Sequence, residues 1–211
     1  MKNLKPLEQR QYNFEIRAEE NESGNIIVGR PIVYDSVTDL GYCAEVVEYG
    51  ALDNADLTDV RFLVNHDISK IPLARSRKNT KNSTMQLSVD DSGMVIKVNL
   101  DTENNTEARN LYSAVKRGDV SGMSFMFSIE SEEWENLDSE YPTRHIKSIG
   151  TVVEVSAVTF PAYESTEINA RGKEAVETAR RAVETARQKR EKSVDTDLKL
   201  EKLKAKYLYS V

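Results

Sequence analysis

Residues 121–129 read SGMSFMFSI, and apolar residues alternate with small or polar ones through the middle of this stretch. Alternation with a period of two is typical of a β-strand, because successive side chains point to opposite faces. Phe125 and Phe127 then share one face, while Ser124 and Met126 share the other. An aromatic face is suited to a core, so the stretch predicts a strand that holds Ser124 on its opposite side.

The sequence up to residue 171 is rich in strand patterns. Apolar runs of strand length occur at residues 14–17, 26–34, 60–64, 123–129 and 151–158. Residues 85–89 and 94–98 flank the sequence DDSG, which predicts a β-hairpin. One internal helix is expected, with Asn104 and Glu107 as a capping pair and Gly118 as its end. We therefore predict an α+β fold, a mostly antiparallel β-barrel with a few surrounding helices and a C-terminal helical tail.

The composition changes at Gly172. Residues 175–188 read AVETARR and then AVETARQ, a seven-residue duplication whose valines and alanines form a narrow apolar stripe. The stripe spans only about two heptads, which favours a solvated helical tail over a stable coiled coil. Residues 193–197 interrupt this pattern, and a second amphipathic piece follows with Leu198, Leu200, Leu203 and Leu208. We predict one domain over residues 1–171 and a basic helical tail over residues 172–211, which is a candidate removable segment or docking arm.

Charge and composition exclude several classes of protein. Residues 172–211 hold 11 basic and 7 acidic side chains, a net charge of +4. Because the whole chain has a formal net charge of −6, residues 1–171 carry a net charge of −10. An acidic body argues against general nucleic-acid binding, because phosphate contacts need clustered Lys and Arg. Two histidines and one cysteine are too few for the usual structural zinc sites or for an internal disulfide. No apolar run is long enough to cross a bilayer, and residues 1–10 lack an apolar signal core, which predicts a cytoplasmic location.

His66 and Ser124 are candidates for nucleophilic catalysis. His66 follows an apolar strand, where a histidine can project into a cleft and act as a general base. A serine hydroxyl needs such a base within hydrogen-bond reach to become nucleophilic. Taken singly, each residue is more often an ordinary surface histidine or strand serine. Asp67 is a poor orienting partner for His66, because adjacent side chains on a strand point apart.

Glu154 is a carboxylate inside the apolar run 151–158. Burying it without a partner would cost several kcal/mol. It could orient a histidine as the acid of a triad, pair with an arginine such as Arg144, or face water on an edge strand. His145 is either a loop residue or a second catalytic histidine. Cys43 is the single thiol, and no flanking pattern supports a nucleophilic role for it.

Several stretches, taken in order, resemble the prohead proteases of tailed bacteriophages, which are serine peptidases distantly similar to the herpesvirus assemblins. They are GRPIVYDS at 29–36, EYGAL at 48–52, VNHD at 64–67 followed by PLAR at 72–75, KRGDVSGMSF at 116–125 and EVSAVTFPAY at 154–163. The resemblance covers about residues 14–171, and five or six motifs in order are more specific than any one of them. The family often has glycine where this chain has Ala74 and Met126, which predicts an altered substrate preference.

The resemblance implies a serine endopeptidase with a Ser–His dyad and a third orienting residue. Carried over, these are Ser124, His66 and, as the candidate for the third position, Glu154, with His145 as its alternative. Backbone amides and Arg75 are candidates for stabilising the oxyanion. No metal or organic cofactor is implied.

The biological role that the resemblance implies is maturation of the procapsid. The enzyme would cleave segments of the scaffold and of the major capsid protein, and also itself, inside the assembling procapsid in the host bacterial cytoplasm. No specific nucleic acid and no membrane is expected as a partner, and the oligomeric state is left open. The alternative is a catalytically inactive capsid-assembly or scaffolding module with the same fold.

Overall fold

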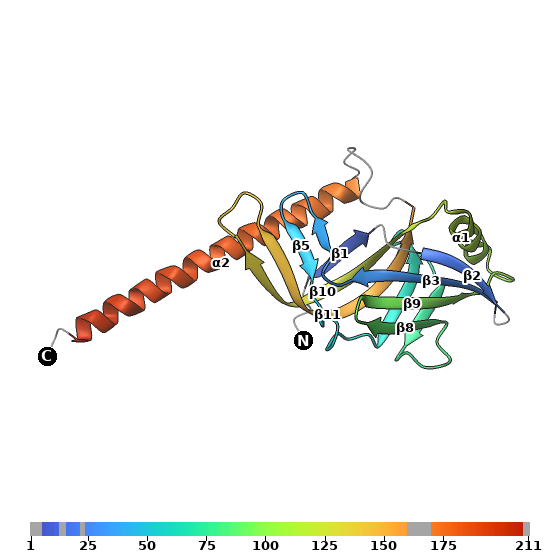
Figure 1. The fold of residues 1–211 in the computed structure, drawn as a ribbon, viewed down its shortest axis with the longest axis horizontal. Helices are drawn as coiled ribbons and strands as arrows, with labels where there is room; N and C mark the ends of the chain where they lie inside the picture. Colours follow the sequence, from blue (N-terminus) through green and yellow to red (C-terminus); the bar gives the residue numbers. More distant parts are fainter. Residues whose placement is uncertain (1–5, 13–15, 22–23, 160–169, 209–211) are drawn as a thin grey trace.

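The computed structural model describes residues 6–12, 16–21, 24–159 and 170–208 (Figure 1). Its elements are β1 (Leu7–Tyr12), β2 (Ile16–Asn21), β3 (Gly24–Val33), β4 (Val37–Asp39), β5 (Ala44–Val47), β6 (Asp59–Val64), β7 (Ala74–Arg77), β8 (Met85–Asp90), β9 (Gly93–Leu100), α1 (Thr106–Arg117), β10 (Gly122–Glu135), β11 (Thr143–Val158) and α2 (Ala170–Leu208). Strands dominate up to residue 158, and a long helix follows, so the predicted α+β class is confirmed. Phe14 and residues 160–163 of the quoted patterns lie outside the described residues.

The strands form two sheets. The larger sheet runs in the order β1-β10-β11-β5-β4, and farther along β11 it continues into β6 and then β7. The smaller sheet runs in the order β2-β3-β9-β8. Most neighbours are antiparallel, but β5 and β6 both run parallel to β11. Among the described strands the two ladders do not join into one ring, so the predicted closed barrel is not confirmed.

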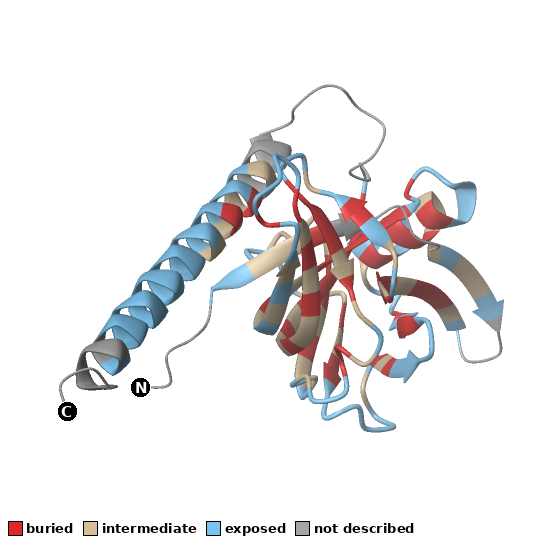
Figure 2. Cartoon of the chain, turned by 60° about the vertical axis from the view of Figure 1, so that its left-hand side comes forward, coloured by how far each residue is buried: buried red, intermediate tan, exposed pale blue. Residues whose placement is uncertain are grey.

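The main hydrophobic core draws side chains from both sheets and from α1. Phe125 and Phe127 of β10 are fully buried, as are Ile27 of β3 and Ile96 of β9. The two phenylalanine rings stack with centroids 4.6 Å apart. Figure 2 shows the buried residues concentrated on the strands and on one face of α1. The predicted core face of β10 is therefore confirmed, and it leaves Ser124 on the opposite face of that strand.

The hairpin predicted around the sequence DDSG is present as β8 and β9. Gly93 begins β9 with a φ of 125°, a backbone conformation that residues other than glycine rarely adopt. A Cβ atom at this position would lie 2.1 Å from the carbonyl oxygen of Ile32 on β3. Glycine is therefore required both for the turn and for the close approach of the neighbouring strand.

Helix α1 ends as predicted but begins with a different cap. Asn105, and not Asn104, is the N-cap, because its backbone is extended and its side chain accepts hydrogen bonds from the amides of Glu107 and Ala108. The Asn104 amide instead donates to the carboxylate of Asp101. Gly118 closes the helix in the left-handed conformation, with a φ of 81°.

Helix α2 runs without interruption through residues 193–197, where the apolar pattern of the sequence is interrupted. The hydroxyls of Ser193 and Thr196 donate to the carbonyl oxygens of Arg190 and Lys192 in the preceding turn. Such back-bonding lets serine and threonine remain inside a helix. No helix among the described residues combines the length and the apolar character that a membrane span requires.

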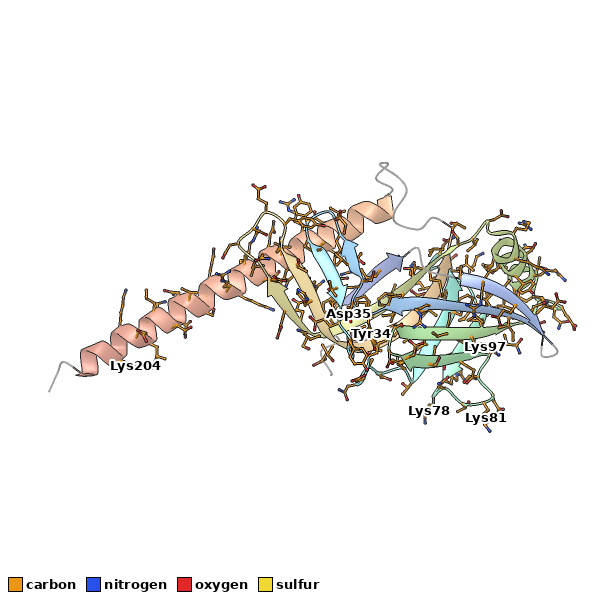
Figure 3. All side chains as sticks on the ribbon, viewed as in Figure 1. Tyr34, Asp35, Lys78, Lys81, Lys97 and Lys204 are labelled. Carbon is orange, nitrogen blue, oxygen red and sulfur yellow. The ribbon has the colours of Figure 1, made fainter. Side chains whose placement is uncertain are left out.

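The first half of α2 packs on the body, whereas its second half extends away from it (Figure 1). Ala179 and Val183 are buried in a small cluster with Cys43. Arg187 donates to the carbonyl oxygen of Leu137, in the connection between β10 and β11. Figure 3 places Lys204 toward the far end of the helix, away from the sheets. The expected boundary at residues 171–172 falls in the first turn of α2, and the division into two domains stays a prediction.

Candidate active site

The larger sheet brings Ser124, Glu154 and His66 together from three strands. Ser124 lies on β10 and is paired in register with Ser156 of β11. Glu154 lies two residues before Ser156, on the same face of β11. Strand β6 runs parallel along the other edge of β11 and ends at Val64, two residues before His66. Three segments that are distant in the sequence therefore meet at one place in the sheet.

His66 lies between Ser124 and Glu154. Its Nε2 atom is 2.5 Å from the Ser124 Oγ, and its Nδ1 atom is 2.5 Å from the Glu154 Oε1. The hydroxyl and the carboxylate thus contact different ring nitrogens, which is the arrangement of a catalytic triad. The side chains of His66 and Glu154 are only 6% and 1% exposed. Hydrogen bonds shielded from water in this way are electrostatically stronger than exposed ones.

The turn that carries His66 has an unusual backbone. Asn65 and His66 have φ angles of 52° and 58°, in the left-handed region that residues other than glycine seldom occupy. Such a conformation persists where the surroundings fix it. The Asn65 amide donates to the Ala157 carbonyl oxygen at 2.9 Å, and the Asn65 Oδ1 accepts from the Thr159 amide at 3.1 Å. The end of β11 therefore holds the turn that aims the imidazole at Ser124.

Ser156 is a member of the site that the sequence analysis did not identify. It is fully buried, and its Oγ donates to the Glu154 Oε2 at 2.6 Å. The same oxygen accepts a hydrogen bond from the backbone amide of His66 at 3.1 Å. Ser156 therefore binds both the carboxylate and the backbone of the histidine. The alternation along β11 could have indicated it, because Glu154 and Ser156 must share a face.

Ser124 has no exposed surface, because β1 covers it. This strand pairs antiparallel with β10, and Gln11 lies opposite Ser124. The Ser124 Oγ lies 2.6 Å from the carbonyl oxygen of Arg10, in addition to its contact with His66. The hydroxyl is therefore enclosed between the imidazole and the backbone of the N-terminal strand.

The two arginines that the sequence analysis considered are engaged elsewhere. Arg75 lies on β7, and its Nε and Nη2 atoms donate to the two carboxylate oxygens of Asp59, each at 2.6 Å. Among the described residues, no hydrogen bond joins it to Ser124, His66 or Glu154. Arg144 pairs with Glu8 and with other carboxylates, and so it is not the partner of Glu154.

His145 lies far from Glu154 along β11, and Cys43 is a buried thiol with a raised pKa. His145 lies on β11 with its Nδ1 2.9 Å from a Glu48 oxygen, and it is nine residues before Glu154 on the same strand. At about 3.3 Å per residue this is roughly 30 Å along the strand. Cys43 is fully buried, and burial raises the pKa of its thiol to about 11. The thiol is therefore neutral near pH 7 and a poor nucleophile.

A cavity of about 260 Å³ lies beside the Glu154 carboxylate. Its apolar wall is formed by Leu63, Ile68, Pro72, Met126 and Val153, and its polar lining by Arg61, Lys70 and Glu154. Met126, for which an altered substrate preference is predicted, thus forms part of this wall. Among the residues that the structure describes, no cluster of His, Cys, Asp and Glu has the arrangement of a metal site.

Comparison with protein families gives a match over residues 12–181 to the family described as caudovirus prohead serine protease. The match includes His66, Ser124 and Glu154, and it extends into the first half of α2. No curated protein and no solved structure matches the chain. Since the matched region covers most of the sequence, the chain belongs to the caudovirus prohead serine protease family.

Proposed function

We propose that the chain is a serine endopeptidase in which Ser124 is the nucleophile, His66 the general base and Glu154 the orienting acid. Membership of the family implies a serine peptidase with a role in the phage procapsid. The observation that supports these three roles is the pair of 2.5 Å contacts that joins the hydroxyl, the imidazole and the carboxylate. A nucleophile, its base and the group that orients the base form the minimal machinery of acyl transfer.

The proposed reaction proceeds through an acyl-enzyme. The Ser124 Oγ attacks the carbonyl carbon of the scissile peptide while the His66 Nε2 takes the hydroxyl proton. His66 then gives this proton to the leaving amine as the peptide bond breaks. Water attacks the ester with His66 again as base, and Ser124 regains its proton as the acid product leaves. Glu154 accepts the Nδ1 proton, which leaves Nε2 free to act and stabilises the imidazolium.

The oxyanion of the tetrahedral intermediate needs hydrogen-bond donors close to Ser124. We assign this role to backbone amides of the cleft, with Arg75 as a candidate helper. To take part, Arg75 would first have to release Asp59. Both side chains of this pair are about one-third exposed, so water would solvate the two separated charges.

The proposed substrates are segments of the scaffold and of the major capsid protein, and the chain itself. The proposed place of action is the assembling procapsid in the host bacterial cytoplasm. Residues 172–211 carry a net charge of +4, and the side chains described beyond residue 187 are exposed. A basic exposed helix is suited to bind acidic segments of capsid or scaffold proteins. We propose that it docks the enzyme on them and is later removed by self-cleavage.

The test is co-expression with the scaffold and major capsid proteins, followed by mass spectrometry of all products. Ser124→Ala should abolish cleavage of these proteins and of the chain itself, while the fold remains intact. Ser128→Ala is the matched control, because Ser128 lies on the same face of β10 and its Oγ contacts only the Thr151 amide among the hydrogen bonds described. Cleavage that continues with Ser124→Ala would contradict the proposal. Equal assembly with wild type and Ser124→Ala, and no cleavage by either, would favour the inactive assembly module.

A further inference from the structure

We propose that β1 occupies the binding site of an extended peptide substrate along the edge of β10, and that it must leave this edge before Ser124 can react. The proposal rests on the catalytic role of Ser124 set out above. It assigns the substrate site to one strand edge, and it assigns an inhibitory role to residues 7–12.

The contact between Arg10 and Ser124 is incompatible with catalysis. The serine hydroxyl has a single proton, so while the Arg10 carbonyl oxygen accepts it, the His66 Nε2 cannot. Nucleophilic attack requires the Oγ to approach a carbonyl carbon, but here a hydrogen bond directs it to the carbonyl oxygen. Strand β1 therefore blocks the nucleophile and is not held as a substrate ready for cleavage.

The pairing of β1 matches the way in which extended peptides bind to sheets. It is an edge strand with β10 as its sheet neighbour, and the two are antiparallel. Extended peptides commonly bind by adding a strand to a free sheet edge. Once β1 leaves, β10 presents such an edge next to Ser124. A substrate in the same register would place a peptide group where that of Arg10 and Gln11 now lies.

Ion pairs hold β1 in this register from the face of the strand opposite Ser124. Arg10 binds both carboxylate oxygens of Glu45 on β5, one of them at 2.6 Å. Arg144 of β11 binds both oxygens of Glu8 at 2.8 and 2.9 Å. Burial alone would raise the pKa of Glu8, but Arg10 and Arg144 outweigh it and hold that pKa below its usual value. A substrate without this charge pattern would lack these ion pairs. They therefore hold β1, in preference to a substrate, at the edge of β10.

The family comparison is consistent with a separate role for β1. The match begins at residue 12, which is the last residue of this strand. The triad lies inside the matched region, and the strand that covers its nucleophile lies almost entirely outside it.

A reversible disulfide between Leu7 and Ser128 would lock β1 in place. These residues lie directly opposite each other, four residues along β10 from Ser124. Opposed residues of antiparallel strands have Cα distances of about 4.5–5.5 Å, which a disulfide can span. The full-length Leu7→Cys/Ser128→Cys protein should acylate Ser124 with a fluorophosphonate at least about tenfold more slowly when oxidised than when reduced, because the rate follows the open fraction. The single variant Ser128→Cys controls for the redox treatment.

Arg10→Met tests the same idea in the opposite direction. It removes the ion pairs of Arg10 but keeps a long side chain, so acylation of Ser124 should be about tenfold faster than in wild type, or more. If circular dichroism shows that this variant does not fold, the comparison of the oxidised and reduced Leu7→Cys/Ser128→Cys protein tests the proposal by itself. Equal acylation in the oxidised, reduced and wild-type proteins would overturn the role of β1 and leave that of Ser124 standing. No acylation of Ser124 in any folded form would overturn the catalytic role itself.

Discussion

Replacement of Ser156 by alanine tests whether the proposed triad depends on the residue beside it. The Ser156 Oγ donates to the Glu154 Oε2 at 2.6 Å and accepts from the His66 amide at 3.1 Å. Alanine removes both hydrogen bonds at a fully buried position. The carboxylate then loses the donor that fixes its second oxygen, and the turn that carries the imidazole loses one of its ties to β11.

The size of the effect follows from these two hydrogen bonds. A bond to a charged group contributes about 1.5–3 kcal/mol and a neutral one about 0.5–1.5 kcal/mol. We expect part of this energy to appear as a free energy of unfolding lower by about 1–2 kcal/mol. The remainder should raise the activation barrier, because His66 is less well oriented. We expect kcat to fall about 10- to 100-fold, since about 1.4 kcal/mol of barrier is a factor of ten. KM should change little, because Ser156 is fully buried.

The assay is steady-state hydrolysis of a peptide taken from a mapped cleavage site, together with chemical denaturation. Ser76→Ala is the matched control: Ser76 is also a fully buried strand serine, but its Oγ has no hydrogen-bond partner among the described residues. We expect this control to leave kcat unchanged. A Ser156→Ala enzyme whose kcat stays within about twofold of wild type would refute the positioning role.

Three further predictions concern separate parts of the molecule. Glu154→Gln should lower kcat by about a hundredfold or more, because the amide cannot stabilise the imidazolium as a carboxylate does; an unchanged steady-state rate would contradict this. Val183→Asp should detach α2 and make Cys43 reactive toward a thiol reagent at pH 8, whereas the wild-type thiol, whose pKa burial raises to about 11, should react slowly. Hydrogen bonding to Arg30 lowers the pKa of Asp90 from 3.8 to about 2, so its stabilising effect is complete above about pH 4 and is lost as the pH falls through about 2. A carbon-detected NMR titration should show the pKa of Asp90 return toward 3.8 in Arg30→Met. Identical titration of Asp90 in the wild type and in Arg30→Met would rule out the ion pair as the cause of the low pKa.

The elements predicted correctly have local sequence signals. The alternation at residues 123–129, the hairpin around Gly93 and the stop at Gly118 each depend on a few neighbouring residues. The N-cap of α1 was misplaced by one residue, because Asn104 and Asn105 are equally good capping types and only the backbone angles distinguish them. The interruption of the apolar pattern at residues 193–197 does not end α2, because hydroxyls that bond to the preceding turn are tolerated in a helix.

Strand β1 could not be predicted from its own residues. It reads LEQRQY, which has no apolar alternation. Its place in the sheet depends on pairing with β10 and on the ion pair between Arg10 and Glu45, which are 35 residues apart. Closure of a barrel also depends on contacts between strands that are distant in the sequence, and so the strand pattern alone could not decide it.

The candidate site was only partly visible in the sequence. His66, Ser124 and Glu154 were selected by motif order, and the structure brings their side chains into one hydrogen-bonded row. The cover of Ser124 by β1 depends on strand register, which motif order does not contain. No contact supports the proposed role of Arg75 in stabilising the oxyanion, because Asp59 binds its guanidinium. The catalytic roles themselves remain predictions.

Identification of the residue that a fluorophosphonate acylates tests the central claim most directly. Wild type and Arg10→Met would be incubated with the probe, digested and sequenced by tandem mass spectrometry, with His66→Ala as the control. We predict a single adduct on Ser124, formed faster in Arg10→Met and lost in His66→Ala, because the hydroxyl needs its base. An adduct on another serine, or one on Ser124 that forms equally well without His66, would contradict the proposed triad.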